Sequence, residues 1–255
     1  MGHADWQQVA TGRSGTVVRR SPDGAAYAKS GSGPLRDELA DERERLAWLA
    51  QSDLPAAEIL DWADDGETAT LTLRTVPGIA LSDLPGSSVP GGIRSLGRFL
   101  RRLHAVDRAS CPFERWLAVT VAIARVRADE ELVDEDDFDS ERAGSSARTI
   151  LLDLLDGRPR AEQLELGDLV VCHGDACLPN FLVDPETLEV TGMIDVGRLG
   201  VADRHLDLAL ASRSMSDTTL NPAYGAAAAE ALLTTYGHPV DPWRLDYYRL
   251  LDEFF

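Results

Sequence analysis

Residues 170–183, VVCHGDACLPNFLV, place four polar side chains between two short apolar runs. These are His173, Asp175, Cys177 and Asn180. Three kinds of site could account for such a stretch: a nucleophilic cysteine, a metal centre, or a loop for phosphoryl transfer. The segments on either side of the stretch favour the third.

A predicted hairpin follows the quoted stretch directly. Residues 181–195, FLVDPETLEVTGMID, read as two short strands around a DPET turn, and the second strand ends at Asp195. Because a short hairpin brings its ends together, Asn180 and Asp195 should meet. With Asp175 they offer two carboxylates and an amide oxygen, the hard donors that suit Mg²⁺ shared with phosphate oxygens.

The N-terminal part supplies a lysine and a glutamate. Residues 5–29 predict short strands that end on Lys29, which is the one lysine among 25 basic residues. Residues 35–51 predict a helix in which Glu42 shares an apolar stripe with Leu39, Leu46 and Leu49. A carboxylate on a packing face is costly unless it is paired. Glu42 therefore either pairs with Lys29 or lies at the edge of the stripe in water, and spacing alone leaves both open.

Taken in order, these residues match the parts of a kinase. In that arrangement Asp175 lies beside the acceptor hydroxyl, Asn180 and Asp195 hold Mg²⁺, and Lys29 meets the nucleotide phosphates while paired with Glu42. Each motif alone is a weak indication. Five residues in the right order, each on the expected type of element, form a strong one.

The competing readings have less support. Cys177 as a nucleophile needs a base and an orienting group, and the polar residues around it already have other roles. The odd count of three cysteines disfavours a disulfide framework. The absence of CxxC spacing disfavours a structural zinc site. His173 is expected to hold the loop through a hydrogen bond to backbone, and His104, near a helix end, is expected to be a structural or capping residue.

The remaining pattern predicts an α+β, bilobal, protein-kinase-like fold. Residues 57–76 read as a hairpin with a DDG turn, and residues 77–92 are rich in Pro and Gly. Helices are expected afterwards, over 93–107, 113–133 and 147–158. We therefore expect a small β-rich nucleotide-binding lobe at 1–76 and a larger, mainly helical catalytic and substrate-binding lobe at 77–255. The chain after Asp195 is expected to turn straight into a helix, which leaves little room for the activation segment of protein kinases.

Composition limits the partners. The net charge is −18, from 25 basic and 43 acidic residues, and such a surface repels nucleic acid. It would attract a polycation, although acidity can also serve solubility alone. No apolar run approaches the roughly 18 residues of a membrane span, and the N-terminus lacks the pattern of a signal peptide. We expect a cytoplasmic protein without nucleic-acid or membrane partners, as a monomer or weak dimer.

From residue 170 to residue 210, VVCHGDACLPNFLVDPETLEVTGMIDVGRLGVADRHLDLAL, the chain resembles the aminoglycoside phosphotransferases. It is most similar to the 3′-phosphotransferases (kanamycin and neomycin kinases) of actinobacterial type. Residues 247–255, YYRLLDEFF, resemble the terminus of that subfamily, and the similarity extends over 35–50, 101–117 and 131–144. Streptomycin 3″-phosphotransferases share much of the pattern, and the DEFF ending favours the 3′ class.

The resemblance implies ATP and Mg²⁺ as cofactors and assigns a role to each matching position. Asp175 is implied as the catalytic base, and Asn180 and Asp195 as Mg²⁺ ligands. Lys29, held by Glu42, is implied to bind the α- and β-phosphates. The implied nucleotide contacts further include Ser14 in the loop over the phosphates, and Arg74 and Val76 in the hinge that meets adenine.

The resemblance also implies a drug pocket lined by carboxylates. Its members here are Asp139, Asp217, Asp252, Glu253 and the terminal carboxylate of Phe255, with Arg198 and Arg213. Ser140 and Ser214 are uncharged where a relative can carry an acid. The implied activity is ATP-dependent phosphorylation of the 3′-hydroxyl of aminoglycosides, which confers resistance. The alternatives are a streptomycin 3″-phosphotransferase and a non-catalytic aminoglycoside-binding protein.

Overall fold

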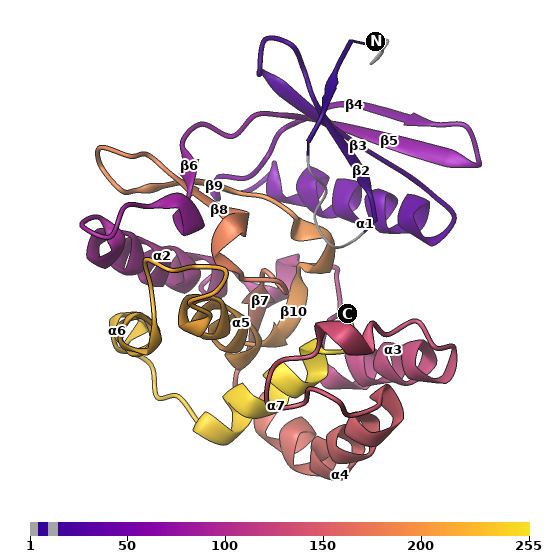
Figure 1. Cartoon of the computed structure of the whole chain (residues 1–255), viewed down its shortest axis with the longest axis vertical. Coiled ribbons are helices and arrows are strands. Elements are labelled where there is room, and N and C mark those ends of the chain that lie inside the picture. Colours follow the sequence, from indigo (N-terminus) through magenta and orange to yellow (C-terminus); the bar gives the residue numbers. More distant parts are fainter. Residues whose placement is uncertain (1–4, 10–14) are drawn as a thin grey trace. The chain divides into compact units, whose positions relative to one another are not determined.

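The computed structural model describes residues 5–9 and 15–255, which form two compact units (Figure 1). The first unit contains the described residues up to Leu84 together with Pro179–Arg198. The second contains Pro85–Leu178 and Leu199–Phe255. Ser14, the residue expected over the phosphates, lies outside the described residues.

The first unit is built on an antiparallel sheet with the strand order β1-β2-β3-β5-β4. Its strands are β1 (Gln7–Gln8), β2 (Val17–Arg20), β3 (Ala26–Ser32), β4 (Ile59–Asp64) and β5 (Thr68–Arg74). Helix α1 (Pro34–Leu49) packs against β3 and β5 (Figure 1). The helix can begin at once after β3 because Gly33 adopts a positive φ of 57° and Pro34 occupies the first turn. The apolar stripe of α1 is buried as expected, at Leu39, Leu46 and Leu49.

A second, small sheet joins the later hairpin to this unit. Strand β6 (Ile79–Ala80) pairs with β8 (Phe181–Val183), which pairs with β9 (Val190–Met193). The backbone of Met193 also exchanges hydrogen bonds with Pro55 and Ala57, at 3.1 and 3.2 Å. The boundary expected after residue 76 therefore differs from the structure: it falls after Leu84, and the hairpin belongs with the first unit because it pairs there.

The second unit consists of six helices around a short antiparallel ribbon. The helices are α2 (Val89–His104), α3 (Leu117–Asp129), α4 (Ala147–Glu165), α5 (His205–Ser216), α6 (Ala226–Tyr236) and α7 (Pro242–Asp252). The ribbon pairs β7 (Leu169–Cys172) with β10 (Gly200–Asp203). Helix α5 packs against both α6 and α7 and is buried along most of its length. Short 3-10 helices lie at Leu81–Asp83, Arg108–Ser110, Glu135–Asp137, Leu178–Asn180 and Val196–Arg198.

The predicted hairpins are confirmed, but four details differ. Helix α3 spans Leu117–Asp129, four residues shorter at each end than the expected 113–133. Helix α2 begins at Val89, earlier than residue 93, with Pro90 in its first turn where no N–H is needed. Helix α4 runs on through Pro159 to Glu165. The prediction of a helix directly after Asp195 is wrong, because β10 intervenes and pairs with all four residues of β7.

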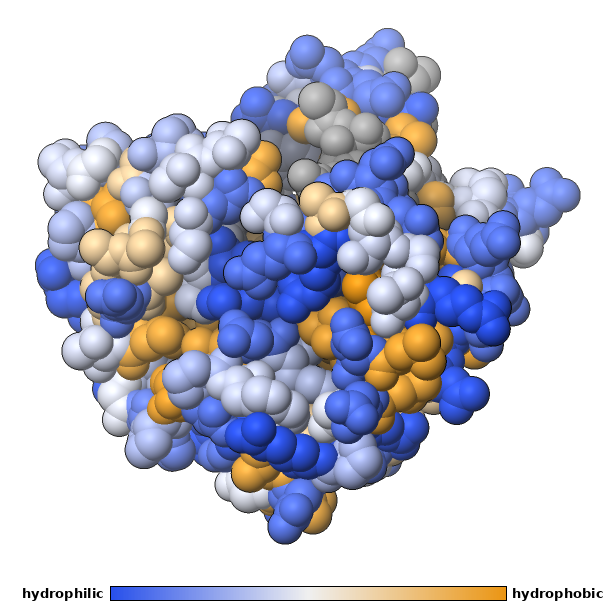
Figure 2. All heavy atoms as spheres, turned by 60° about the horizontal axis from the view of Figure 1, so that its bottom comes forward, coloured by the Kyte–Doolittle hydropathy of each residue, from blue (hydrophilic) through white to orange (hydrophobic). Residues whose placement is uncertain are grey.

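The surface of one face is mainly hydrophilic. Hydrophilic residues predominate on the face drawn in Figure 2, and hydrophobic ones form separate small patches there. Within the part of the chain that the structure describes, no helix has the length and apolar character to cross a bilayer. Cys111 and Cys172 are buried, and Cys177 is partly buried.

Candidate active site

Lys29 and Glu42 form a buried ion pair inside the first unit. Lys29 lies on β3, between β2 and β5, and its Nζ is 2.8 Å from Oε1 of Glu42 and 2.9 Å from Oε2. The side chain of Glu42 is only 6% exposed. The choice that spacing left open is thereby decided: Glu42 pairs with the lysine and does not reach into water.

The charge on Lys29 is strongly favoured. Burial opposes the ammonium form, but the carboxylates of Glu42 and Asp195 outweigh it and raise the pKa of Lys29 above its usual value. The Nζ atom donates to Oδ1 of Asp195 as well as to Glu42. A compact ammonium group is thus held between a buried carboxylate and a half-exposed one.

The hairpin β8–β9 brings Asn180 and Asp195 together, as predicted. Phe181 pairs with Met193, and the N–H of Ile194 donates to the carbonyl of Asn180 at 3.0 Å. Asn180 is buried, whereas the side chain of Asp195 is 52% exposed. Asp195 has a φ of 57°, in the left-handed region that Asp and Asn adopt more readily than other side chains.

These two residues can hold a metal ion of the expected kind. An amide side chain and a carboxylate follow the two ends of one hairpin in the first unit. Both offer hard oxygen donors, which suit Mg²⁺ better than softer metals, and the open face of Asp195 leaves room for water and phosphate oxygens. The donor chemistry therefore fits the implied Mg²⁺.

The loop that carries Asp175 belongs to the second unit and is held at its start by α5. Asp207 of α5 accepts the N–H of His173 at 2.7 Å and that of Gly174 at 2.9 Å. The ring of His173 accepts the N–H of Asp175 through Nδ1, at 3.2 Å. The expectation that His173 holds the loop through backbone is thereby confirmed.

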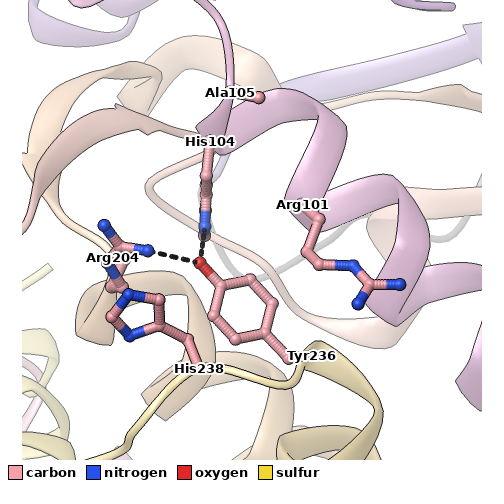
Figure 3. Close-up of a pocket in the computed structure, with 6 residues that line it drawn as sticks. All are labelled: Arg101, His104, Ala105, Arg204, Tyr236 and His238. Carbon is pink, nitrogen blue, oxygen red and sulfur yellow. Dashed lines mark hydrogen bonds between the residues drawn. The ribbon is translucent and has the colours of Figure 1, made fainter.

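The side chain of His104 contacts Asp207 and lines a small pocket. Its Nε2 is 3.0 Å from Oδ2 of Asp207, and its Nδ1 is 2.8 Å from the hydroxyl of Tyr236. Burial opposes the carboxylate of Asp207, but the bond to His104 and the backbone donors outweigh it and lower its pKa. Figure 3 shows the Tyr236 hydroxyl between His104 and Arg204. These three residues line a pocket of about 210 Å³. His104 is thus structural, as predicted.

A cluster of carboxylates and arginines forms in the second unit. Arg213 reaches Oδ2 of Asp252 at 2.5 Å and Oδ2 of Asp139 at 3.5 Å. Glu253 accepts the backbone N–H of Asp139 at 3.3 Å and pairs with Arg142 at 3.2 Å. Four residues expected in the drug pocket, far apart in sequence, are therefore together: Asp139, Arg213, Asp252 and Glu253.

Burial and nearby charges raise the pKa values of Glu253 and Cys177 at this cluster. Burial raises the pKa of the Glu253 carboxyl, and the nearby charge of Asp139 adds to the shift. Burial likewise raises the pKa of the Cys177 thiol, and the carboxylates of Asp175 and Asp252 add to it. Cys177 therefore remains a thiol beside Asp175, which argues against a nucleophilic thiolate. The ring of Phe255 lies 5.3 Å from the guanidinium of Arg115.

Other expected residues make contacts of their own. Within the described residues, the side chain of Asp217 caps its own turn by accepting the N–H groups of Thr219 and Leu220. Arg74 is exposed and pairs with Glu58 at 2.6 Å. Val76 packs beside Gly192. Arg198 follows Asp195 in the first unit.

The contacts of Ser214 differ from the role that the sequence suggested. It was expected where an acid facing the drug can occur, but it is buried, and its Oγ accepts the N–H of Leu178 at 3.1 Å. Asp207 was also missed. Its signal was an acidic residue within a long apolar stretch, 206–211, which indicates a buried and therefore partnered carboxylate.

The comparisons with known proteins agree with this geometry. A model of the phosphotransferase enzyme family matches residues 5–245. An aminoglycoside 3′-phosphotransferase of Streptomyces fradiae is 40% identical over 263 aligned residues, covering 99% of this chain and 96% of that protein. A streptomycin 3″-kinase of Streptomyces griseus is 38% identical, covering 97% of this chain and 91% of that protein.

Solved structures confirm the predicted α+β, protein-kinase-like fold. The aminoglycoside phosphotransferase APH(3″)-Id of Streptomyces rimosus superposes with a TM-score of 0.91 and 34% identity, covering 99% of this chain and 93% of that one. An aminoglycoside 3′-phosphotransferase of type VIII has a TM-score of 0.89 and 39% identity, covering 100% and 95%. The first enzyme has also been solved in complex with ADP and streptomycin.

Proposed function

The chain belongs to the phosphotransferase enzyme family, and we propose that it transfers the γ-phosphoryl group of ATP to the 3′-hydroxyl of aminoglycosides such as kanamycin and neomycin. The observation that carries this proposal is the buried pair of Lys29 and Glu42 beside the exposed carboxylate of Asp195. A lysine held in this way is the phosphate-binding arrangement of kinases. A structural salt bridge would not need the third, half-exposed carboxylate.

The residues of the first unit bind the nucleotide in this proposal. Lys29 contacts the α- and β-phosphates, and Glu42 fixes its position. Asn180 and Asp195 hold Mg²⁺, which neutralises charge on the phosphate oxygens when bound. Three further nucleotide contacts are part of the proposal: Ser14 over the phosphates, and Arg74 and Val76 at adenine.

Asp175 acts on the acceptor. Its carboxylate orients the 3′-hydroxyl and takes the proton as the oxygen bonds to the γ-phosphorus. The bond from that phosphorus to the bridging oxygen breaks, and ADP leaves with the electron pair. The products are ADP and the aminoglycoside 3′-phosphate, without a covalent enzyme intermediate. Positioning and fixed charge supply most of the rate enhancement.

The acidic cluster of the second unit binds the drug. Aminoglycosides carry several ammonium groups, and carboxylates already gathered at Asp139, Asp252 and Glu253 match them. We include the terminal carboxylate of Phe255 in this set, together with Arg198, Arg213 and Asp217. The proposed role of the reaction is antibiotic resistance in the cytoplasm, where both ATP and the ribosomal target of these drugs are found.

Streptomycin is the second candidate substrate. The similarity to a streptomycin 3″-kinase, at 38% identity, is close to that of the 3′ enzymes, and a 3″ enzyme superposes with a TM-score of 0.91. In that case the acceptor is the 3″-hydroxyl, while the roles of Lys29, Asp175 and Asp195 are unchanged.

Release of ADP in the presence of kanamycin, streptomycin and tobramycin tests the proposal. Tobramycin lacks a 3′-hydroxyl, so a 3′ enzyme should turn over kanamycin and leave tobramycin unmodified. ³¹P and ¹H NMR of the product should place the phosphate on O3′ of kanamycin. Turnover of streptomycin alone would establish the second candidate. Tight drug binding without ADP release from any of the three would instead indicate a sequestering protein.

A further inference from the structure

Helix α5 holds the loop of residues 173–178 at both of its ends. At the first end, Asp207 accepts the N–H groups of His173 and Gly174. At the second end, the Oγ of Ser214 accepts the N–H of Leu178 at 3.1 Å. Asp175 lies between these two anchors, so its backbone is fixed from both directions.

The spacing of Asp207 and Ser214 along α5 allows one helix to hold both ends of the loop. Asp207 and Ser214 are seven residues apart on α5, which is about two helical turns and places them on one face, about 10.5 Å apart along the axis. Both are buried, at 0% and 9% exposure. One rigid helix thus sets the distance between the two ends of the loop.

Ser214 is itself fixed by Asn221. The Nδ2 of Asn221 donates to the carbonyl of Ser214 at 2.8 Å and lies 3.4 Å from its Oγ. Asn221 is 3% exposed, and its own N–H donates to the carbonyl of Asp217 at 2.8 Å. The hydroxyl of Ser214 is therefore held in the orientation that meets Leu178.

Water cannot readily replace the Oγ of Ser214 as the acceptor for the N–H of Leu178. The side chain of Leu178 is fully buried, and a buried N–H without an acceptor is costly. Without the Oγ of Ser214, this end of the loop would shift until the N–H found another partner. Such a shift would move Asp175, three residues earlier, relative to the acceptor hydroxyl.

We propose that Ser214 is a positioning residue for the proposed reaction, which fixes the C-terminal end of the Asp175 loop through the N–H of Leu178. The inference rests on the proposed function, because its kinetic readout is phosphoryl transfer. It assigns Ser214 to the support of the loop, in place of a drug contact.

Ser214→Ala tests the proposal. The expected kcat is about 10- to 100-fold lower, the loss typical of a displacement of about 1 Å. The KM for the drug should stay within about twofold, because Ser214 is buried and its Oγ faces Leu178. Ser214→Thr keeps the acceptor oxygen and should restore most of kcat. Ser214→Cys, with a weaker acceptor of similar size, should fall between alanine and wild type.

Ser95→Ala is the matched control. Ser95 is a buried serine of the same unit, at 3% exposure on α2, and its Oγ has no hydrogen-bond partner within the described residues. Its removal should leave kcat unchanged. An equal loss in both alanine variants would overturn the proposal, because it would show a general effect of deleting buried hydroxyls.

Amide hydrogen exchange at Leu178 supplies a readout that does not depend on activity. Its exchange rate should rise at least tenfold in Ser214→Ala and stay unchanged in Ser95→Ala. If the wild type lacks phosphotransferase activity while Leu178 responds as expected, the proposed function fails but the anchor stands. An unchanged exchange rate, or a raised KM for the drug with kcat intact, overturns the anchor.

Discussion

Lys29 Nζ lies 2.8 Å and 2.9 Å from the two carboxylate oxygens of Glu42, so one ammonium group satisfies both acceptors of a buried side chain. A single small donor fits between the oxygens and can still contact Asp195. A guanidinium group is wider and planar, and cannot take this central position without displacing one partner. The geometry gives a reason for lysine at this one position in a chain that otherwise uses arginine.

Lys29→Arg should therefore lower kcat at least tenfold, although the charge is kept. Steady-state kinetics with ATP and kanamycin measure this effect. Arg36→Lys is the matched control, since Arg36 on α1 pairs with Asp64 at a more exposed position, and it should leave kcat unchanged. Wild-type activity in Lys29→Arg would contradict the role of the point charge.

Asp195→Asn should abolish Mg²⁺-dependent nucleotide binding while it preserves the fold. The φ of 57° at this position is tolerated by asparagine, whereas alanine in the left-handed region costs about 1 kcal/mol more. Asp195→Ala should thus lose binding and also unfold more easily than Asp195→Asn. Isothermal titration with ATP and Mg²⁺ and denaturant unfolding measure the two effects. Equal stability of the two variants would count against backbone strain at this site.

Asp175→Ala should reduce turnover by several orders of magnitude and leave ATP binding intact, because the nucleotide residues belong to the first unit and Asp175 to the second. Asp184→Asn is the control. Its side chain caps the turn of the β8–β9 hairpin by accepting two N–H groups, which asparagine can also accept. Full activity of Asp175→Ala would refute its assignment as the base.

Asp252→Asn should raise the KM for kanamycin about tenfold, with a smaller change in kcat. The carboxylate belongs to the acidic cluster beside Arg213, and an ammonium group of the drug is its expected partner. The KM of the wild type should also rise with ionic strength more steeply than that of the variant. Asp246→Asn, on the exposed face of the same helix, should behave like the wild type.

Glu165 should make stability depend on pH. Burial raises the pKa of this carboxyl from 4.5 to about 7, and the hydrogen bond from the N–H of Leu117 only partly offsets burial. The folded state therefore holds the proton more tightly than the unfolded state. The contribution of Glu165 is most favourable below pH 4.5 and is lost as pH rises to about 7.

Glu165→Gln keeps an acceptor for Leu117 and removes the titration. Its melting temperature should fall less than that of the wild type between pH 5 and pH 8. Glu162→Gln, on the same helix and paired with Arg158 at the surface, should keep the wild-type difference. Identical pH dependence in the wild type and Glu165→Gln would rule out Glu165 as the source.

Local patterns predicted much of the fold and most of the nucleotide-binding set. Strand and helix periodicities placed Lys29 on a strand and Glu42 on a helix, and turn residues placed Asn180 and Asp195 at the ends of a hairpin. These features depend on residues close in sequence, so spacing alone was enough. The strand β10 was missed because its four residues are a strand only through pairing with β7, about thirty residues earlier.

By itself, the sequence determined the order of the elements, the motif residues and the family resemblance, because each depends on local spacing and residue type. Only the tertiary structure decided that Glu42 faces Lys29, that the β8–β9 hairpin pairs within the first unit, and that Ser214 supports a loop. It also gathered Asp139, Arg213 and Asp252 into one cluster. Such contacts join residues far apart in the chain, and their pairing is set by the packing of whole elements, which no local pattern records.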